Sequence, residues 1–419
     1  MLHSIPLLYL LLLPSVVSAL PRGTRASPLP TLESRASELI TPPNKSDNHW
    51  VDSWGSMPRL VDARDLPPVP FTTPEEVFAN ATLTQTVRLT LGGDLLRIRI
   101  SNAFGGSDLP ITGVSVALAS GDVSGVSEVQ EGTTQRLTFG GEESVTVPMG
   151  ALVVSDPVQL STPVKATTIL TVSIYSKEGQ KTNSITGASG EPDYQLDLPS
   201  PVQGQVPLGE GKAGVDRWYW LSGVEVWTAT TNSAVIIIGD SITDGSGSTA
   251  AIASSPTVAG PASFPASTET SWLIPPSRTP IIFEGVNDIL NTPSDAEAQT
   301  ALAQRMIWGL KQIVERLHTQ NIVVVGGTIA PFSEPGGNNV NRETTRRTVN
   351  EWIRTGRVFY SVVDFEKVLA DPKSPEQLLE AYDTGDHLHP SVAGFQAMVD
   401  VFQLDVFDLG LPQGNRKPQ

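Results

Sequence analysis

A serine that directly follows a buried apolar strand is the first feature of this sequence with chemical potential. Ser241 lies in the segment Gly239-Asp240-Ser241-Ile242, after the continuous apolar run at 234–238. In open α/β sheets, ligands bind at the carboxyl ends of the strands, and a turn there presents a side chain at that edge. Backbone N–H groups at the start of a following helix can face a negatively charged oxygen. The segment therefore predicts nucleophilic chemistry at Ser241.

A serine hydroxyl is a poor nucleophile unless a neighbouring base removes its proton. His318 ends an amphipathic segment and His49 begins a β-rich region, so neither is the expected base. The remaining histidines lie in the stretch 383–390, which reads Asp-Thr-Gly-Asp-His-Leu-His-Pro. The base is therefore expected in this stretch.

Two acid–base pairs are available within that stretch. Asp386 and His389 are three residues apart, so one helical turn would bring them to the same face, with Asp386 orienting the imidazole. Asp383 and His387, four apart, form a rival pair. We favour the first pair because Pro390 marks a turn immediately after it. A third interpretation is a metal site, since His-x-His suits a strand, but no further ligand cluster is evident.

An asparagine follows a second buried strand. The run at 280–283 is apolar, and Glu284-Gly285-Val286-Asn287-Asp288 comes directly after it. Parallel neighbouring strands end at the same sheet edge, so Asn287 is expected near the nucleophile. An amide N–H there stabilises a developing oxyanion by roughly 2.7–4 kcal/mol.

These three blocks, in this order, resemble signature blocks of the SGNH/GDSL hydrolase family: 239–241, 285–288 and 386–390. The resemblance covers about residues 232–405. It implies a flavodoxin-like α/β domain in which Ser241 is the nucleophile and Asp386 and His389 complete a triad. It also implies that Asn287 and the backbone N–H of Ser241 are the oxyanion donors. No metal or organic cofactor is implied.

One family block has no clear counterpart. The family places a glycine oxyanion donor after a second strand, but the interval 246–279 is rich in Ala, Ser, Thr and Pro without a steady period. Gly260 stands between Ala259 and Pro261, and we expect no strand before it. The sequence thus leaves open whether strand 2 of a sheet ordered 2-1-3-4-5 is present. Our hypothesis is a deletion or a mis-predicted splice junction, which sequencing the transcript would test.

The elements that must position these residues fall into two halves. After 228, apolar runs at 234–238, 280–283, 322–325 and 358–363 alternate with helical patterns at 295–317, 342–353 and 392–402, which predicts a parallel α/β sheet. Before 228, short alternating strands predict an all-β sandwich or jelly roll. These strands are expected at 82–91 and 95–100, paired as a hairpin, and at 114–119, 135–139, 144–147, 167–175 and 218–226. Trp50-Val-Asp-Ser-Trp54 and the segment 97–105 resemble the β-sandwich that precedes this hydrolase domain in some secreted members.

Composition and the N-terminus predict the compartment. The apolar run from Ile5 to Val17 followed by Ser18-Ala19 is typical of a signal peptide and is short for a membrane span. The sequons at Asn44 and Asn80 suit a secreted glycoprotein. The expected domains are a signal peptide (1–19), a flexible leader (20–45), the β-sandwich domain (46–230), the hydrolase domain (231–410) and a tail (411–419).

The sequence therefore predicts a secreted, extracellular serine ester hydrolase of 419 residues. The resemblance suggests acyl esters of small molecules or carbohydrates, including carbohydrate O-acetyl esters. A net charge of −16 with no basic footprint argues against nucleic-acid partners, and stable membrane insertion is not expected. The oligomeric state is left open. The alternative is a catalytically impaired or non-catalytic secreted binding protein derived from the family, because of the missing block.

Overall fold

The structure is a computed structural model, and it describes residues 47–56, 58–189, 194–197, 213–214, 217–243, 258–259, 280–320, 322–333 and 339–402. The expected signal peptide, leader and C-terminal tail, and the sequon at Asn44, lie outside the described residues. So does the interval 246–279, apart from Val258 and Ala259. The expected domain boundaries stay predictions.

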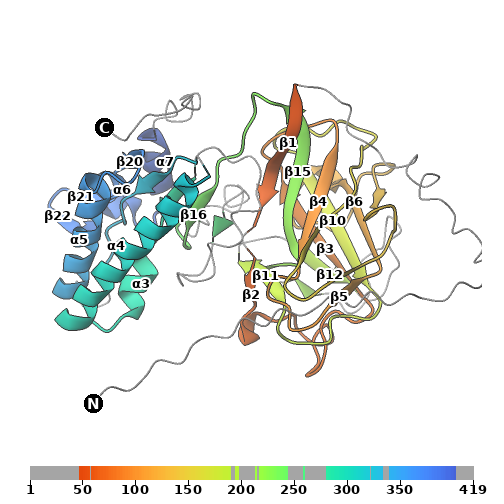
Figure 1. Cartoon of the computed structure of the whole chain (residues 1–419), viewed down its shortest axis with the longest axis horizontal. Helices are drawn as coiled ribbons and strands as arrows, with labels where there is room; N and C mark the ends of the chain where they lie inside the picture. Colours follow the sequence, from red (N-terminus) through yellow and green to blue (C-terminus); the bar gives the residue numbers. More distant parts are fainter. Residues whose placement is uncertain are drawn as a thin grey trace, which may run out of the picture. The chain divides into compact units, whose positions relative to one another are not determined.

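The N-terminal half is built from antiparallel strands (Figure 1). A four-stranded sheet has the order β1 (Asn48–Gly55), β15 (Leu221–Ala229), β4 (Leu96–Ser101) and β9 (Leu152–Val154). A six-stranded sheet has the order β13 (Ala213–Gly214), β12 (Tyr194–Asp197), β3 (Ala81–Arg88), β10 (Ile169–Ser176), β6 (Gly113–Leu118) and β7 (Gln135–Leu137). Smaller sheets join β14 (Arg217–Tyr219), β11 (Thr186–Ser189) and β2 (Arg59–Leu60), and pair β5 (Leu109–Ile111) with β8 (Val145–Val147). Two short 3-10 turns lie at Ala63–Asp65 and Ser120–Asp122.

One hydrophobic cluster joins the two larger sheets. Ile98 and Val224 from the four-stranded sheet and Leu83 and Val172 from the six-stranded sheet are at most 1% exposed and belong to the same cluster. Burying such side chains is the main source of stability for a sheet that presents one apolar face. The antiparallel β character is thus confirmed, whereas the jelly-roll connectivity stays a prediction.

The expected hairpin between 82–91 and 95–100 is wrong. Both strands exist, as β3 and β4, but they belong to different sheets. The connecting glycines lie against distant backbone: a Cβ on Gly92 would come within 2.4 Å of the Val164 carbonyl oxygen. A Cβ on Gly93 would come within 2.8 Å of the Trp227 carbonyl oxygen. Gly92 and Gly93 therefore do not form a hairpin turn. They lie where the chain passes from one sheet to the other, so close to the backbone of other segments that a side chain would not fit.

The C-terminal half contains the predicted parallel sheet. Its order is β17 (Val258–Ala259), β16 (Ile237–Gly239), β18 (Ile281–Phe283), β19 (Val325–Gly327) and β20 (Ser361–Val363). The helices are α3 (Val286–Asn291), α4 (Ala296–His318), α5 (Val340–Thr355), α6 (Phe365–Leu369) and α7 (Val392–Asp400). A two-stranded ribbon, β21 (Ala370–Asp371) with β22 (Ser374–Leu378), and a 3-10 turn at Glu380–Tyr382 follow α6. The parallel sheet confirms the expected α/β fold of this half.

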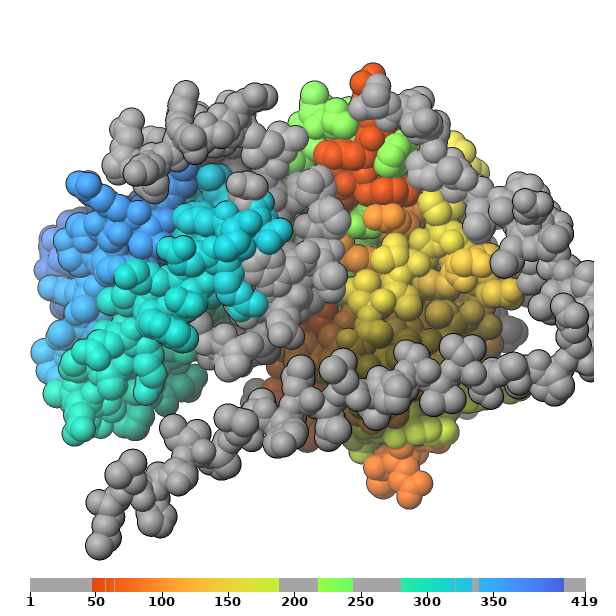
Figure 2. All heavy atoms as spheres, in the orientation of Figure 1, coloured from red at the N-terminus to blue at the C-terminus, as the bar shows by residue number. Residues whose placement is uncertain are grey.

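Helix packing fixes the sheet. Helices α4 and α5 lie side by side in Figure 1 and contact each other. Met306 and Leu310 of α4 are each 2% exposed and join the strand residues Ile282 and Val325 in one cluster. In the space-filling view of Figure 2, the described residues of these helices, in teal to blue, form a continuous packed surface. No helix in the described ranges has the length and apolarity that crossing a membrane requires.

The expectation that no strand precedes Gly260 is wrong. Val258 and Ala259 form β17, which pairs in parallel with Ile238 and Gly239 of β16. The strand is only two residues long, so the local alternation on which sequence reasoning depends is absent. Gly260 lies outside the described residues, as does the helix expected after Ser241.

Candidate active site

A tight turn at the carboxyl end of β16 presents Ser241. Strand β16 ends at Gly239, and the Asp240 side chain accepts a hydrogen bond from the Ile242 N–H at 2.9 Å. Ile242 is 2% exposed and packs in the core, which anchors the turn. A Cβ on residue 239 would lie 1.8 Å from the Thr243 hydroxyl oxygen and 2.5 Å from the Phe283 carbonyl oxygen. Only glycine therefore lets the chain reverse this closely against β18.

The structure brings Ser241, His389 and Asp386 together in one hydrogen-bonded chain. The Ser241 hydroxyl lies 2.8 Å from Nε2 of His389, and Nδ1 of His389 lies 2.5 Å from Oδ2 of Asp386. A carboxylate on Nδ1 places the proton of the neutral imidazole there, so Nε2 carries the lone pair that accepts the serine proton. The distances suit proton transfer without movement of the chain.

Backbone contacts hold Asp386 in its ionised form. Burial opposes ionisation, but the hydrogen bonds outweigh it and lower the pKa of Asp386 below its usual range. The donors are the His389 backbone N–H and imidazole, the Leu388 backbone N–H and the Thr384 side chain. A carboxylate with several N–H donors stays charged, as a group that must stabilise an imidazolium requires.

The loop 383–390 is itself fixed at both ends. An antiparallel bridge joins Asp383 to Pro390, and the Thr384 N–H donates to the His389 carbonyl at 3.2 Å. The loop after β19 adds a further bond, from the Ser333 N–H to the His387 carbonyl oxygen at 2.9 Å. Residues from two parts of the chain therefore position the imidazole.

Asn287 lies in the first turn of α3, four residues after β18 ends at Phe283. Phe283 is the register partner of Gly239, so Asn287 and Ser241 follow neighbouring strands at one sheet edge. Gly285 precedes the helix with φ of 129°, and a Cβ there would meet the Met306 methyl at 2.4 Å. Glycine is thus required for the chain to turn into α3 over the core.

Three carboxyl groups follow the strands at the same sheet edge and affect one another's ionisation, a feature that sequence reasoning missed. Asp240 is 4% exposed, and burial raises its pKa to about 6 despite the attraction of His389. Burial also raises the pKa of Asp288 to about 6. Burial and repulsion by these two groups raise the pKa of Glu284 well above its usual value. The sequence did contain a signal for this cluster of carboxyl groups, because Asp240 directly follows the buried strand β16 and Glu284 directly follows its neighbour β18.

The rival pair of the sequence is also formed. Nδ1 of His387 lies 2.7 Å from Oδ2 of Asp383. His389, and not His387, is the histidine that contacts Ser241, so the pair of Asp386 and His389 is the one that serves the nucleophile.

The third interpretation of the sequence was a metal site. Within the part of the chain that the structure describes, no three acidic or histidine side chains are grouped to hold a metal ion.

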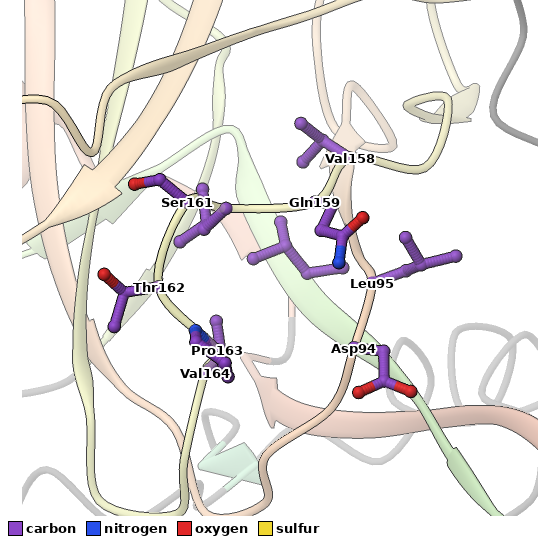
Figure 3. Close-up of a pocket in the computed structure, with 10 residues that line it drawn as sticks. Asp94, Leu95, Val158, Gln159, Ser161, Thr162, Pro163 and Val164 are labelled. Carbon is purple, nitrogen blue, oxygen red and sulfur yellow. The ribbon is translucent and has the colours of Figure 1, made fainter.

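A cavity elsewhere lacks such chemistry. A cavity of about 80 Å³ lies between the 158–164 segment and the start of β4, and Figure 3 shows its lining. Asp94 is its one ionisable side chain, and the rest of the lining is aliphatic, hydroxyl or amide (Figure 3). Ligand pockets are commonly about 300–1,000 Å³, so this cavity is too small for most ligands. The carboxyl edge of the parallel sheet, where Ser241, His389 and Asp386 lie, remains the candidate active site.

Part of the chain is similar to a known protein family. Residues 237–397 match the model of the GDSL-like Lipase/Acylhydrolase family. This segment contains the turn after β16, α3 and the loop 383–390. The match concerns this segment of the chain and does not extend to the β-rich half.

Solved structures similar to the chain are distant. A GDSL-like lipase from Bacteroides thetaiotaomicron is 14% identical, with a TM-score of 0.31, over 40% of this chain and 84% of its own. A salicylyl-acyltransferase from a tetracycline biosynthetic pathway is 13% identical, with a TM-score of 0.31, over 88% of this chain and 97% of its own. A peptidoglycan O-acetylesterase is 10% identical, with a TM-score of 0.30, over 85% of this chain and 82% of its own. No curated protein matches the chain.

Proposed function

We propose that this protein is a secreted serine ester hydrolase whose nucleophile is Ser241. The observation that carries the proposal is the hydrogen-bonded chain from Ser241 through His389 to Asp386 at the carboxyl edge of the parallel sheet. The His389 side chain is 17% exposed, which suits a group that meets substrate and water. Secretion rests on the expected signal peptide and on the sequon at Asn80, whose side chain is exposed.

The geometry supports an acyl-enzyme mechanism. His389 Nε2 takes the Ser241 proton while Oγ bonds to the ester carbonyl carbon. Asp386 stabilises the imidazolium, and the proton on Nε2 then passes to the leaving alcohol as the acyl–oxygen bond breaks. In the second half of the reaction, His389 Nε2 takes a proton from water while the water oxygen bonds to the acyl carbon. The proton then returns to Ser241 Oγ as the bond between Oγ and the acyl carbon breaks, and the carboxylic acid is released. No further group is needed to balance these steps.

The negatively charged oxygen of the tetrahedral intermediate needs hydrogen-bond donors that the Ser241–His389–Asp386 chain does not supply. We assign the Asn287 side-chain amide and the Ser241 backbone N–H to this role. The register of β16 and β18 supports this assignment, because Ser241 and Asn287 follow the ends of these two neighbouring strands. Donors fixed before the reaction stabilise developing charge without reorganisation.

The charges of the site favour neutral esters. Asp240 and Asp288, with pKa values of about 6, are largely ionised at neutral pH, and the whole chain carries a net charge of −16. A negative field repels anionic acyl or leaving groups. Acetyl esters of neutral carbohydrates satisfy this condition.

Turnover of p-nitrophenyl acetate by purified protein tests the proposal. The wild type is expected to release nitrophenol with saturation kinetics, and Ser241→Ala is expected to fall to the background rate. Ser120→Ala, which changes an exposed serine in the β-rich half, is the matched control. Equal rates for wild type and Ser241→Ala would refute the enzyme assignment.

A non-catalytic binding protein is the second candidate. The observation that favours it is the shortness of β17, since Val258 and Ala259 are the residues beside this edge of β16 that the structure describes. In that case wild type and Ser241→Ala would share the same background rate.

A further inference from the structure

The loop that carries His389 holds a second imidazole–carboxylate pair that the proposed mechanism does not use. Oδ1 of Asp383 accepts hydrogen bonds from the Gly385 N–H at 2.8 Å and the His387 N–H at 3.0 Å. Its Oδ2 binds Nδ1 of His387 at 2.7 Å. The Asp383 side chain is 12% exposed and the His387 side chain 56% exposed. The carboxylate is thus held inside the loop, and the imidazole extends toward solvent.

The backbone at His387 is unusual. Its φ is 63°, in the left-handed region that is uncommon for residues other than glycine, although asparagine, aspartate and histidine enter it more often than the rest. The same backbone unit also accepts the bond from Ser333. A turn with no further task would be served better by glycine, as at Gly385, where φ is 100°. Such conformations cluster at functional sites, which points to a role for the imidazole itself.

The position of the pair identifies the part of the substrate it meets. His389 gives its proton to the leaving alcohol, so the alcohol portion of the ester lies beside the loop 383–390. The oxyanion donors lie on other elements, at Ser241 and in α3. His387 is two residues from His389 in a loop closed by the Asp383–Pro390 bridge. The loop that carries His387 therefore borders the alcohol side of the site.

We propose that His387, oriented by Asp383, binds a hydroxyl group on the alcohol portion of the ester. Donation of the Nδ1 proton to Asp383 leaves Nε2 as a hydrogen-bond acceptor. A hydroxyl is the donor that a polyol or sugar offers next to its ester oxygen and that a simple alkyl ester lacks. The inference rests on the proposed function and names its substrate class: partly acylated polyols, including carbohydrates.

The test compares two neutral acetates that differ in free hydroxyl groups, glycerol monoacetate and propyl acetate. The variant is His387→Asn, because asparagine tolerates the left-handed backbone. One lost neutral hydrogen bond predicts a fall of about 3- to 10-fold in the ratio of kcat/KM for glycerol monoacetate to that for propyl acetate. Asp383→Asn should lower the ratio in the same direction.

The controls separate this inference from the proposed function. His318→Asn, at the end of α4, should leave the ratio unchanged. Titration of Ser241 with a fluorophosphonate normalises each rate to correctly folded sites. If Ser241→Ala abolishes both activities but His387→Asn leaves the ratio unchanged, the inference fails and the esterase assignment stands. If the wild type hydrolyses neither acetate but does hydrolyse p-nitrophenyl acetate, the inference fails and the esterase assignment stands. If it hydrolyses none of the three, both fail.

Discussion

The buried carboxyl beneath the nucleophile predicts a specific pH dependence of stability. Asp240 is 4% exposed, and burial raises its pKa to about 6, against 3.8 for an unperturbed group. Asp240→Asn keeps the shape of the side chain and the oxygen that accepts the Ile242 N–H. It removes the ability to ionise and replaces one carboxylate oxygen with an amide N–H2 group. The pH dependence of the difference between variant and wild type therefore reports the cost of the charge, together with its effect on Glu284.

The size and sign follow from the difference between the two pKa values. The difference corresponds to about 3 kcal/mol, at roughly 1.36 kcal/mol per pH unit. Because the folded pKa is raised, the stability contribution of Asp240 is complete below pH 3.8 and is lost as the pH rises through about 6. Between pH 4 and pH 8 the wild type should therefore lose up to about 3 kcal/mol relative to Asp240→Asn.

Urea unfolding followed by far-UV circular dichroism at pH 4, 5, 6, 7 and 8 measures this difference. The gap in unfolding free energy between the variant and the wild type should grow across the series and level off above pH 7. A gap that is constant from pH 4 to pH 8 would refute the reasoning. A buried charge that lowers stability at neutral pH, as the Asp240 carboxylate is expected to do, is common at functional sites, where stability is lost in favour of activity. The site does supply an opposing attraction, since His389 lowers the pKa of Asp240 against the larger effect of burial.

The remaining predictions concern catalysis and the turn. Asp386→Asn should lower kcat for p-nitrophenyl acetate by about 10⁴-fold, because the amide favours the wrong imidazole tautomer, while Asp400→Asn on α7 should not change it. Asn287→Ala should lower kcat by about 10²- to 10³-fold with little change in KM, and an increase confined to KM would contradict an oxyanion role. Gly239→Ala should abolish fluorophosphonate labelling of Ser241, because its Cβ would overlap the Thr243 hydroxyl at 1.8 Å. Gly55→Ala, with its nearest contact at 3.8 Å, is the matched control, and equal labelling of the two variants would contradict the packing argument.

Sequence reasoning worked where local pattern determines the outcome. The continuous apolar runs predicted β16 and β18, because strands buried on both faces need no alternation. The pair Asp386 and His389, which the sequence favoured over its rival, is the pair that contacts Ser241. The helical turn expected to bring the two together is wrong, because the loop 383–390 is not helical and His387 has a φ of 63°. The helix α4 was expected at 295–317 and lies at Ala296–His318, with Asp295 capping its first turn.

It failed where distant contacts decide. Alternation predicted β3 and β4 but not their partners, since the crossing at Gly92 depends on Val164, far along the chain. The single strand expected at 218–226 is broken at Trp220, whose φ is 62°. The short elements α6 and β17 are held by packing and pairing, and segments of two to five residues carry no readable period. The burial of Asp240 depends on the packed sheet edge and is not visible in the sequence.

The central claim is that Ser241 is an activated nucleophile, and covalent labelling tests it most directly. Purified protein treated with a fluorophosphonate at neutral pH should gain one phosphonyl group, and peptide mass mapping should place it on Ser241. His389→Ala should suppress the labelling, because no base then takes the serine proton. An unlabelled wild type, or a label on another residue, would contradict the account.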